Sequence, residues 1–213
     1  MLTLTILAML AGLLVVVISM MFRRPTPVPA PAMSAPQASA VIDAHPWNAR
    51  RGDVISIRGA AEDFSDLDFT VDRRSAYQAT NHRWVDLSGE FRGRRVYLEV
   101  FGRPQTEAMG LLDGKKMTLP DVSLTEDQMA DFDSRQDPNA AITYDGKTWH
   151  YESSREIGYF ENESGEGEGL YRWLFREQGG DRSLCIEKWE GEPFDVRIAR
   201  RVSISDINVY RSA

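Results

Sequence analysis

The sequence predicts a mainly β fold, in which two related antiparallel units pack as a sandwich or a split barrel with one short helix, after a single transmembrane helix. An uncharged apolar run at the N-terminus, short alternating runs from about residue 50 onward, and one internal repeat lead to this prediction. The expected parts are a membrane anchor over residues 1–24, a Pro/Ala-rich linker over 25–49 and a β domain over 50–213.

The apolar run over residues 2–22 is long enough to cross a bilayer. About 20 residues at a rise of ~1.5 Å span a hydrocarbon core of about 30 Å. A cleaved signal peptide is the alternative, but such a peptide carries basic residues before its apolar core, and none stand there. Arg23 and Arg24 follow the run directly, so the positive-inside tendency predicts a single-pass protein with its C-terminal domain in the cytoplasm.

The linker begins with residues 25–40, which alternate proline with small residues. Proline fixes φ and disfavours helix in the residue before it. We therefore expect an extended spacer, partly in the polyproline II conformation, between the anchor and the folded domain.

The β domain is predicted from ten short runs rich in β-branched and aromatic residues. These runs are Val54–Ile57, Phe69–Val71, Trp84–Leu87, Val96–Val100, Thr148–Tyr151, Glu156–Phe160, Leu170–Phe175, Ser183–Trp189, Phe194–Ile198 and Ile204–Tyr210. Asp113-Gly114 and Asp145-Gly146 are typical of hairpin turns. One helix is expected over 124–132, with Ser123 and Glu126 as a capping box.

Two half-repeats, 50–119 and 140–211, follow from the spacing of matched residues. Tyr77 matches Tyr159, Trp84 matches Trp173, and Glu99 matches Glu187, with a Gly/Glu-rich insertion in the second copy. Chance similarity between β-rich stretches is the alternative. If the repeat is real, both tryptophans should be buried at equivalent positions.

Several stretches resemble an uncharacterised bacterial family that is known as a domain of unknown function. They include Gly52–Ile57, Arg95–Val100, Gly165–Gly169 and Ile186–Glu192, and the resemblance covers residues 50–211. It implies an accessory β domain at the bacterial inner membrane, because genes of that family often lie beside phage shock protein A homologues and potassium-channel-like or S-adenosylmethionine decarboxylase-like proteins. It brings no catalytic residues with it.

The composition excludes several classes of function. The chain has 25 Lys and Arg against 32 Asp and Glu, and its net charge of -7 argues against binding to nucleic acid. A single cysteine, Cys185, rules out an intramolecular disulfide. His45, His82 and His150 share no ligand spacing with it, so we assign no catalytic, cofactor-binding or metal-ligating residue.

Two groups of residues are nevertheless candidates for chemistry. Gly165, Glu166, Gly167, Glu168 and Gly169 form an unusual acidic run, which with Glu161 and Glu163 could offer oxygens to Ca²⁺, although a flexible hairpin loop explains it better. We predict that this run is a candidate interaction loop. Glu99 and Glu187 could act as a carboxylate pair, but their alternation with apolar neighbours favours two outward-facing side chains.

The sequence as a whole favours a membrane-tethered, non-enzymatic binding or scaffold domain, without a cofactor and accessory to an envelope-stress or other membrane-associated system. Its partners would be the lipid bilayer, through residues 2–22, and a protein of unknown identity. The alternative is a small carboxylate- or metal-dependent hydrolase that uses the Gly165–Gly169 loop.

Overall fold

The computed structural model describes residues 41–42, 45–80, 82–102 and 107–212. The expected transmembrane helix and the proline-rich stretch at 25–40 lie outside these residues. Within the described part, no helix is both long enough and apolar enough to cross a membrane.

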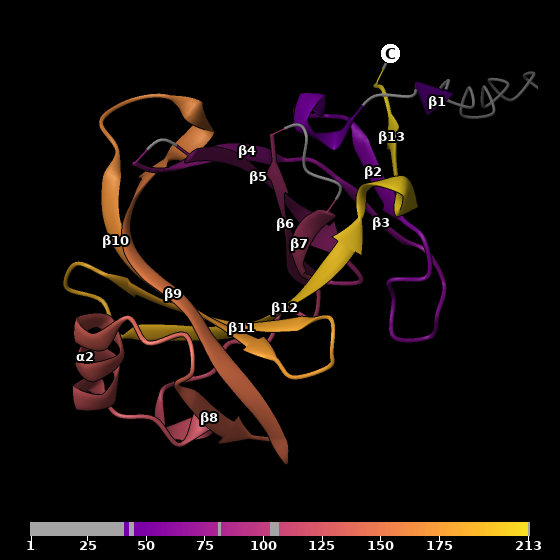
Figure 1. Ribbon diagram of the computed structural model, residues 1–213. Coiled ribbons are helices and arrows are strands. Elements are labelled where there is room, and N and C mark those ends of the chain that lie inside the picture. Colours follow the sequence, from indigo (N-terminus) through magenta and orange to yellow (C-terminus); the bar gives the residue numbers. More distant parts are fainter. Residues whose placement is uncertain (1–40, 43–44, 81, 103–106, 213) are drawn as a thin grey trace, which may run out of the picture. The chain divides into compact units, whose positions relative to one another are not determined.

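The described chain is mainly antiparallel β structure, as expected, and eight of its strands close into a barrel (Figure 1). Around the barrel the order is β10-β11-β12-β7-β6-β5-β4-β9, and pairing between β9 and β10 completes the ring. The barrel strands are β4 (Arg73–Ala79), β5 (His82–Phe91), β6 (Arg94–Phe101), β7 (Glu107–Leu111), β9 (Lys147–Phe160), β10 (Glu168–Glu177), β11 (Arg182–Trp189) and β12 (Phe194–Ser203). Of the two arrangements expected, the sandwich is wrong and a barrel is found, because the two four-stranded units pair with each other along both edges, β4 with β9 and β7 with β12.

A second sheet of four strands, in the order β1-β13-β2-β3, lies against the outer face of β5, β6 and β7 (Figure 1). Its strands are β1 (Val41–Ile42), β2 (Val54–Ile57), β3 (Leu67–Thr70) and β13 (Ile207–Tyr210). Ile55 and Phe69 of this sheet pack on Val85 and Leu98 of the barrel. The sheet comes so close that a Cβ on Gly89 would lie 2.2 Å from the Thr70 carbonyl oxygen, so this position requires glycine.

Helix α2 (Glu126–Arg135) and strand β8 (Ala141–Tyr144) lie outside the barrel on the other side, over β9 to β12. The helix is confirmed, but its cap is Thr125 with Gln128, not Ser123 with Glu126. Ser123 instead has a left-handed backbone, with φ of 58°, and ends the short 3-10 helix Pro120–Val122. The remaining 3-10 helices are Pro46–Asn48, Glu161–Glu163 and Ile204–Asp206.

The turns and strand limits agree only in part with the sequence prediction. Asp145 and Gly146 have φ of 52° and 66° and join β8 to β9 as a two-residue hairpin turn. Asp113-Gly114 joins no paired strands, since the next residue to pair, Met117, forms an isolated bridge with Val196. The two runs expected between Thr148 and Phe160 are one long strand, β9. Strands β1, β4, β7 and β8 were not expected, and β1 lies within the segment assigned to the linker.

The tryptophans at matched repeat positions are both buried, as predicted, at 6% and 7% exposure. They nevertheless face opposite ways. The Trp84 indole N–H donates to Glu99 inside the barrel, whereas that of Trp173 donates to the Met129 carbonyl of helix α2 outside it. The alignment of Arg83-Trp84 with Arg172-Trp173 is therefore wrong by one residue, since Trp84 shares the lumen-facing orientation of Arg172 and not that of Trp173.

Candidate functional site

The interior of the barrel contains an ionic cluster beside two small apolar clusters, while its outer face carries the two larger apolar cores. In strand β5, Val85 and Leu87 belong to the core under the small sheet, and Asp86 between them points inward. Strand β6 repeats this arrangement, with Leu98 in the outer core and Glu99 in the lumen. Side chains alternate between the two faces of a strand, so every second residue of a barrel strand faces the lumen. In β5 and β6 the lumen-facing residues include the charged ones.

Arg172 of β10 lies at the centre of the interior cluster. Its Nη1 and Nη2 atoms donate to the two carboxylate oxygens of Glu99 at 2.9 and 2.8 Å, and its Nε donates to Glu187 at 2.9 Å. The guanidinium carbon also lies 4.7 Å from the centre of the Tyr77 ring. Burial raises the pKa of Glu99, although its bonds to Arg172 act in the opposite direction. The cluster thus joins β6, β10 and β11 across the lumen.

Asp86 has no comparable partner. It is 2% exposed, and its Oδ1 atom accepts no hydrogen bond within the described structure. It stands directly opposite Glu99 in the β5–β6 ladder, where like charges are unfavourable. Burial, reinforced by the nearby Glu99 carboxylate, raises the pKa of Asp86 to about 8. Asp86 is therefore mostly protonated at neutral pH.

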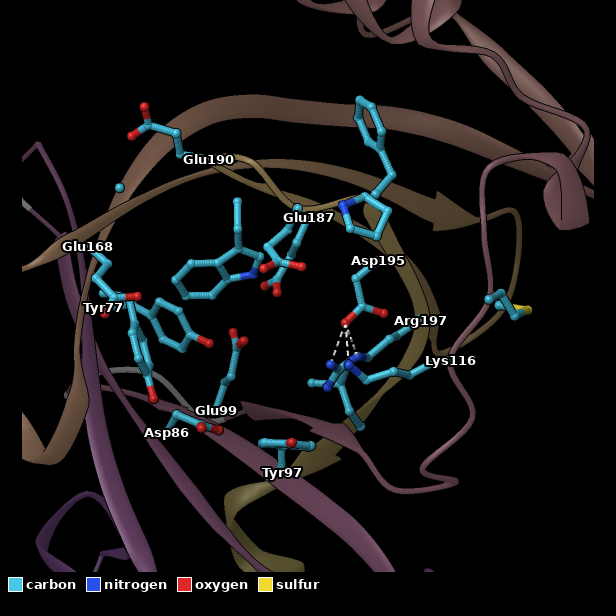
Figure 2. Close-up of a pocket in the computed structure, with 18 of the residues that line it drawn as sticks. Tyr77, Asp86, Tyr97, Glu99, Lys116, Glu168, Glu187, Glu190, Asp195 and Arg197 are labelled. Carbon is cyan, nitrogen blue, oxygen red and sulfur yellow. Dashed lines mark hydrogen bonds and ion pairs between the residues drawn. The ribbon is translucent and has the colours of Figure 1, made fainter.

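A second ionic group lies further along the lumen, on β12. Arg197 donates from Nε to Asp195 at 3.0 Å, and the ammonium of Lys116 lies 3.3 Å from the same carboxylate (Figure 2). Burial alone would raise the pKa of Asp195, but the bonds to Arg197 outweigh it and lower that pKa. Asp195 also stands opposite Glu187 in the β11–β12 ladder, a second pair of facing carboxylates.

These groups line a cavity of about 970 Å³ (Figure 2). Three basic residues contribute to its wall, namely Arg73, Lys116 and Arg197, and five aromatic ones, namely Tyr77, Tyr97, Tyr159, Trp189 and Phe194. Seven acidic residues line it, namely Asp86, Glu99, Glu168, Glu187, Glu190, Glu192 and Asp195. Glu168, Glu190 and Glu192 are exposed, so they rim the mouth, whereas Asp86 and Glu99 are buried. The cavity is therefore acidic and aromatic.

Only part of the expected interaction loop, Gly165–Gly169, contributes to the wall of this cavity. Gly167, Glu168 and Gly169 line the cavity, whereas Gly165 and Glu166 do not contribute to its wall. The neighbouring carboxylates expected to share a cation are engaged elsewhere: Glu163 accepts from Arg74 at 2.8 Å, and Glu161 from Arg73 at 3.3 Å. Over the residues that the structure describes, no three His, Cys, Asp or Glu side chains are grouped to hold a metal ion.

The outward orientation expected for Glu99 and Glu187 is wrong. Both point into the lumen and bind Arg172. Their alternation with apolar residues suggested a solvent face, but in a closed barrel the polar face is the interior. Cys185 lies on an inward position of β11, where burial raises the pKa of its thiol and disfavours the reactive thiolate.

The family model described as "Domain of unknown function (DUF4178)" matches residues 51–204. The chain belongs to this family. No curated protein and no solved structure matches the chain. The DUF4178 segment contains all eight barrel strands and every residue that lines the cavity, so the acidic lumen lies wholly within the family domain.

Proposed function

We propose that this DUF4178 domain is a non-enzymatic binding domain that takes a small polar molecule into the barrel lumen. The observation that carries the proposal is the cavity, with the buried, unpartnered carboxyl of Asp86 in its wall. A buried polar atom without a hydrogen bond costs about 1–3 kcal/mol, and a ligand that supplies the missing bond would recover that free energy. The volume suits the purpose, since ligand cavities commonly measure about 300–1,000 Å³.

Membrane attachment, which is an expectation from the sequence, is part of the proposal. The apolar run 2–22 would anchor the chain, with the barrel on the side of Arg23 and Arg24, in the cytoplasm. Residues 25–40 would hold it away from the bilayer. An anchored receptor for a small molecule fits an accessory role in an envelope-stress or other membrane-associated system. Its protein partner would bind differently to the ligand-bound and the ligand-free domain.

A hydrolase that uses the Gly165–Gly169 region is the second candidate. It is favoured by the position of Glu168 at the cavity mouth, close to Gly167 and Gly169. A metal-dependent thermal shift separates the two functions, because a metal that binds only the folded protein raises its melting temperature. A specific shift with Ca²⁺, Mg²⁺, Mn²⁺ or Zn²⁺, lost on Glu168→Gln, would favour the hydrolase.

The binding function is tested with a panel of cationic, neutral and anionic small molecules on the full-length protein. At a concentration of about 100 Kd, a ligand of the folded state adds about 2.7 kcal/mol to the free energy of unfolding. We expect at least one class to raise the melting temperature of the wild type and to have a smaller effect on Leu111→Trp, whose larger side chain would narrow the lumen. If no class does so, the lumen is not a binding site.

A further inference from the structure

We propose that the ligand of the lumen is an organic cation, an ammonium or guanidinium group on an aromatic or apolar body, whose charged group bonds to Asp86. This inference rests on the proposed binding function and specifies its ligand. It is drawn from the balance of charges in the lumen, from the way the lumen already holds one guanidinium, and from the unpartnered Asp86 carboxyl.

Each basic group that lines the cavity, and Arg172 beside it, already has a carboxylate partner, although the buried Nε atom of Arg73 has no hydrogen bond in the described structure. Arg172 is bound by Glu99, Arg197 and Lys116 share Asp195, and Arg73 reaches Glu161. An incoming anion would have to displace one of these carboxylates and would pass the exposed glutamates at the mouth.

The surplus charge is acidic. Four of the carboxylates that line the cavity form no ion pair with any described residue, namely Asp86, Glu168, Glu190 and Glu192. Three of them rim the mouth and attract cations at neutral pH, and Asp86 inside the lumen adds a fourth negative charge when it ionises.

Arg172 shows how this lumen binds a cation. Two carboxylates bond to its guanidinium, and the Tyr77 and Trp84 rings lie 4.7 and 5.7 Å from its central carbon. Further along the wall, Tyr159 and Trp189 form an edge-to-face pair with centroids 5.3 Å apart, both lining the cavity. Aromatic rings attract cations by about 0.5–2 kcal/mol, and they also accommodate an apolar body.

A metal ion fits this wall less well than an organic cation. A hard cation needs about six or more oxygen ligands, and the described residues contain no cluster of three candidate ligands. A guanidinium or ammonium group needs only one or two carboxylates at hydrogen-bond distance, as Arg172 has. Its remaining surface can lie against the aromatic wall.

Binding of a cation beside Asp86 should be coupled to the release of a proton. Asp86 is surrounded by charged and titratable groups from several strands, namely Arg73 and Tyr77 of β4, Glu99 of β6, Tyr159 of β9, Arg172 of β10 and Glu187 of β11. With its pKa raised to about 8, Asp86 carries a proton at neutral pH. A bound cation favours the ionised carboxylate, so binding below about pH 8 should release a proton from Asp86.

The test uses benzylguanidinium, whose charge does not titrate near neutral pH, against its neutral isostere benzylurea and the anion phenylacetate. Calorimetric titration of the full-length protein, in a mild non-ionic detergent, gives the affinity. Buffers of different ionisation enthalpy give the number of protons released. We expect benzylguanidinium alone to bind, with roughly tenfold to a hundredfold higher affinity at about pH 9 than at about pH 6, because the fraction of Asp86 that is ionised rises.

Two isosteric substitutions separate Asp86 from general charge effects. Asp86→Asn should weaken benzylguanidinium binding at least about tenfold at pH 9 and abolish both the proton release and the pH dependence. Asp68→Asn removes an exposed carboxylate from the small sheet and should behave as the wild type. The melting temperature of each variant, measured in parallel, reports whether it folds.

Three results would overturn the inference. Equal binding of benzylurea would show that charge is not recognised, and stronger binding of phenylacetate would reverse the sign of the ligand. Binding of benzylguanidinium without proton release, unchanged in Asp86→Asn, would remove Asp86 from the site. In each case the protein still binds a small molecule, and a weaker effect of that molecule on Leu111→Trp would place it in the lumen and preserve the binding function. The failure of the whole panel to bind would reject both.

Discussion

Replacing Arg172 with methionine tests whether the interior ion cluster holds the barrel together. Glu99 is 2% exposed and would keep only the Trp84 indole N–H, at 3.1 Å, while still facing Asp86 and Glu187. Removing one partner of a buried ion pair leaves an uncompensated charge, which costs about 3–5 kcal/mol. We expect Arg172→Met to lower the free energy of unfolding by that amount at neutral pH.

Urea unfolding, followed by tryptophan fluorescence and circular dichroism, gives the free energy. The matched control is Arg155→Met, because Arg155 lies directly opposite Arg172 in the β9–β10 ladder but is exposed and has no ion-pair partner in the described structure. Such a surface change should cost within about 0.5 kcal/mol. Adding Glu99→Gln to Arg172→Met removes the stranded charge and should restore part of the loss.

The stability cost of Arg172→Met should depend on pH. The pKa of Glu99 is already raised by burial, and losing Arg172 should raise it further. An acid whose pKa is raised by folding contributes stability at low pH that is lost as pH rises through the folded pKa. The cost of Arg172→Met should therefore be smaller near pH 5 than near pH 8. A cost below about 1 kcal/mol, equal at both pH values, would refute the reasoning.

Three further outcomes are expected. Wild-type stability should fall as pH rises from about 4 through about 8, because the folded protein holds the Asp86 proton, whereas urea melts of Asp86→Asn should lack this part of the decline. Trp84→Ala and Trp173→Ala should each cost about 3–5 kcal/mol in the same melts, and only the first should alter binding in the lumen. Protease added to intact spheroplasts should leave the C-terminal domain uncut, and exchanging Arg23 and Arg24 for glutamate with lysines added after Met1 should expose it.

Local sequence patterns predicted the strand-rich fold because the outer cores are apolar at every second residue. Val96, Leu98 and Val100 identify β6 in this way, and the helix was predicted in the right place although the residues assigned to its cap were wrong. Strand β4 was missed because its first half, Arg73 to Ser75, is polar. The two four-stranded units meet through pairing of β4 with β9 on one side and of β7 with β12 on the other, and local periodicity does not encode pairing order.

The lumen was missed for a different reason. In an open sheet, a polar residue between two apolar ones faces water, and Glu99 and Glu187 were assigned accordingly. One signal in the sequence indicates otherwise. Trp84 shares a face with Asp86, and Trp189 with Glu187, so the charged face of each strand also carries a large aromatic side chain. Large apolar or aromatic side chains on both faces of a strand suggest that both faces are covered.

The arrangement of the cores explains how the barrel tolerates its interior. Asp86 faces Glu99 and Glu187 faces Asp195, and like charges directly opposite each other are destabilising in a sheet. The apolar contribution to stability instead comes from two large clusters outside the ring, one under the small sheet and one under helix α2, and from two smaller clusters on its lumen side. Asp86→Asn should stabilise the empty protein above about pH 8, where Asp86 would otherwise be ionised beside Glu99, while it weakens cation binding. That opposition between stability and affinity is what a binding site, rather than a structural core, would show.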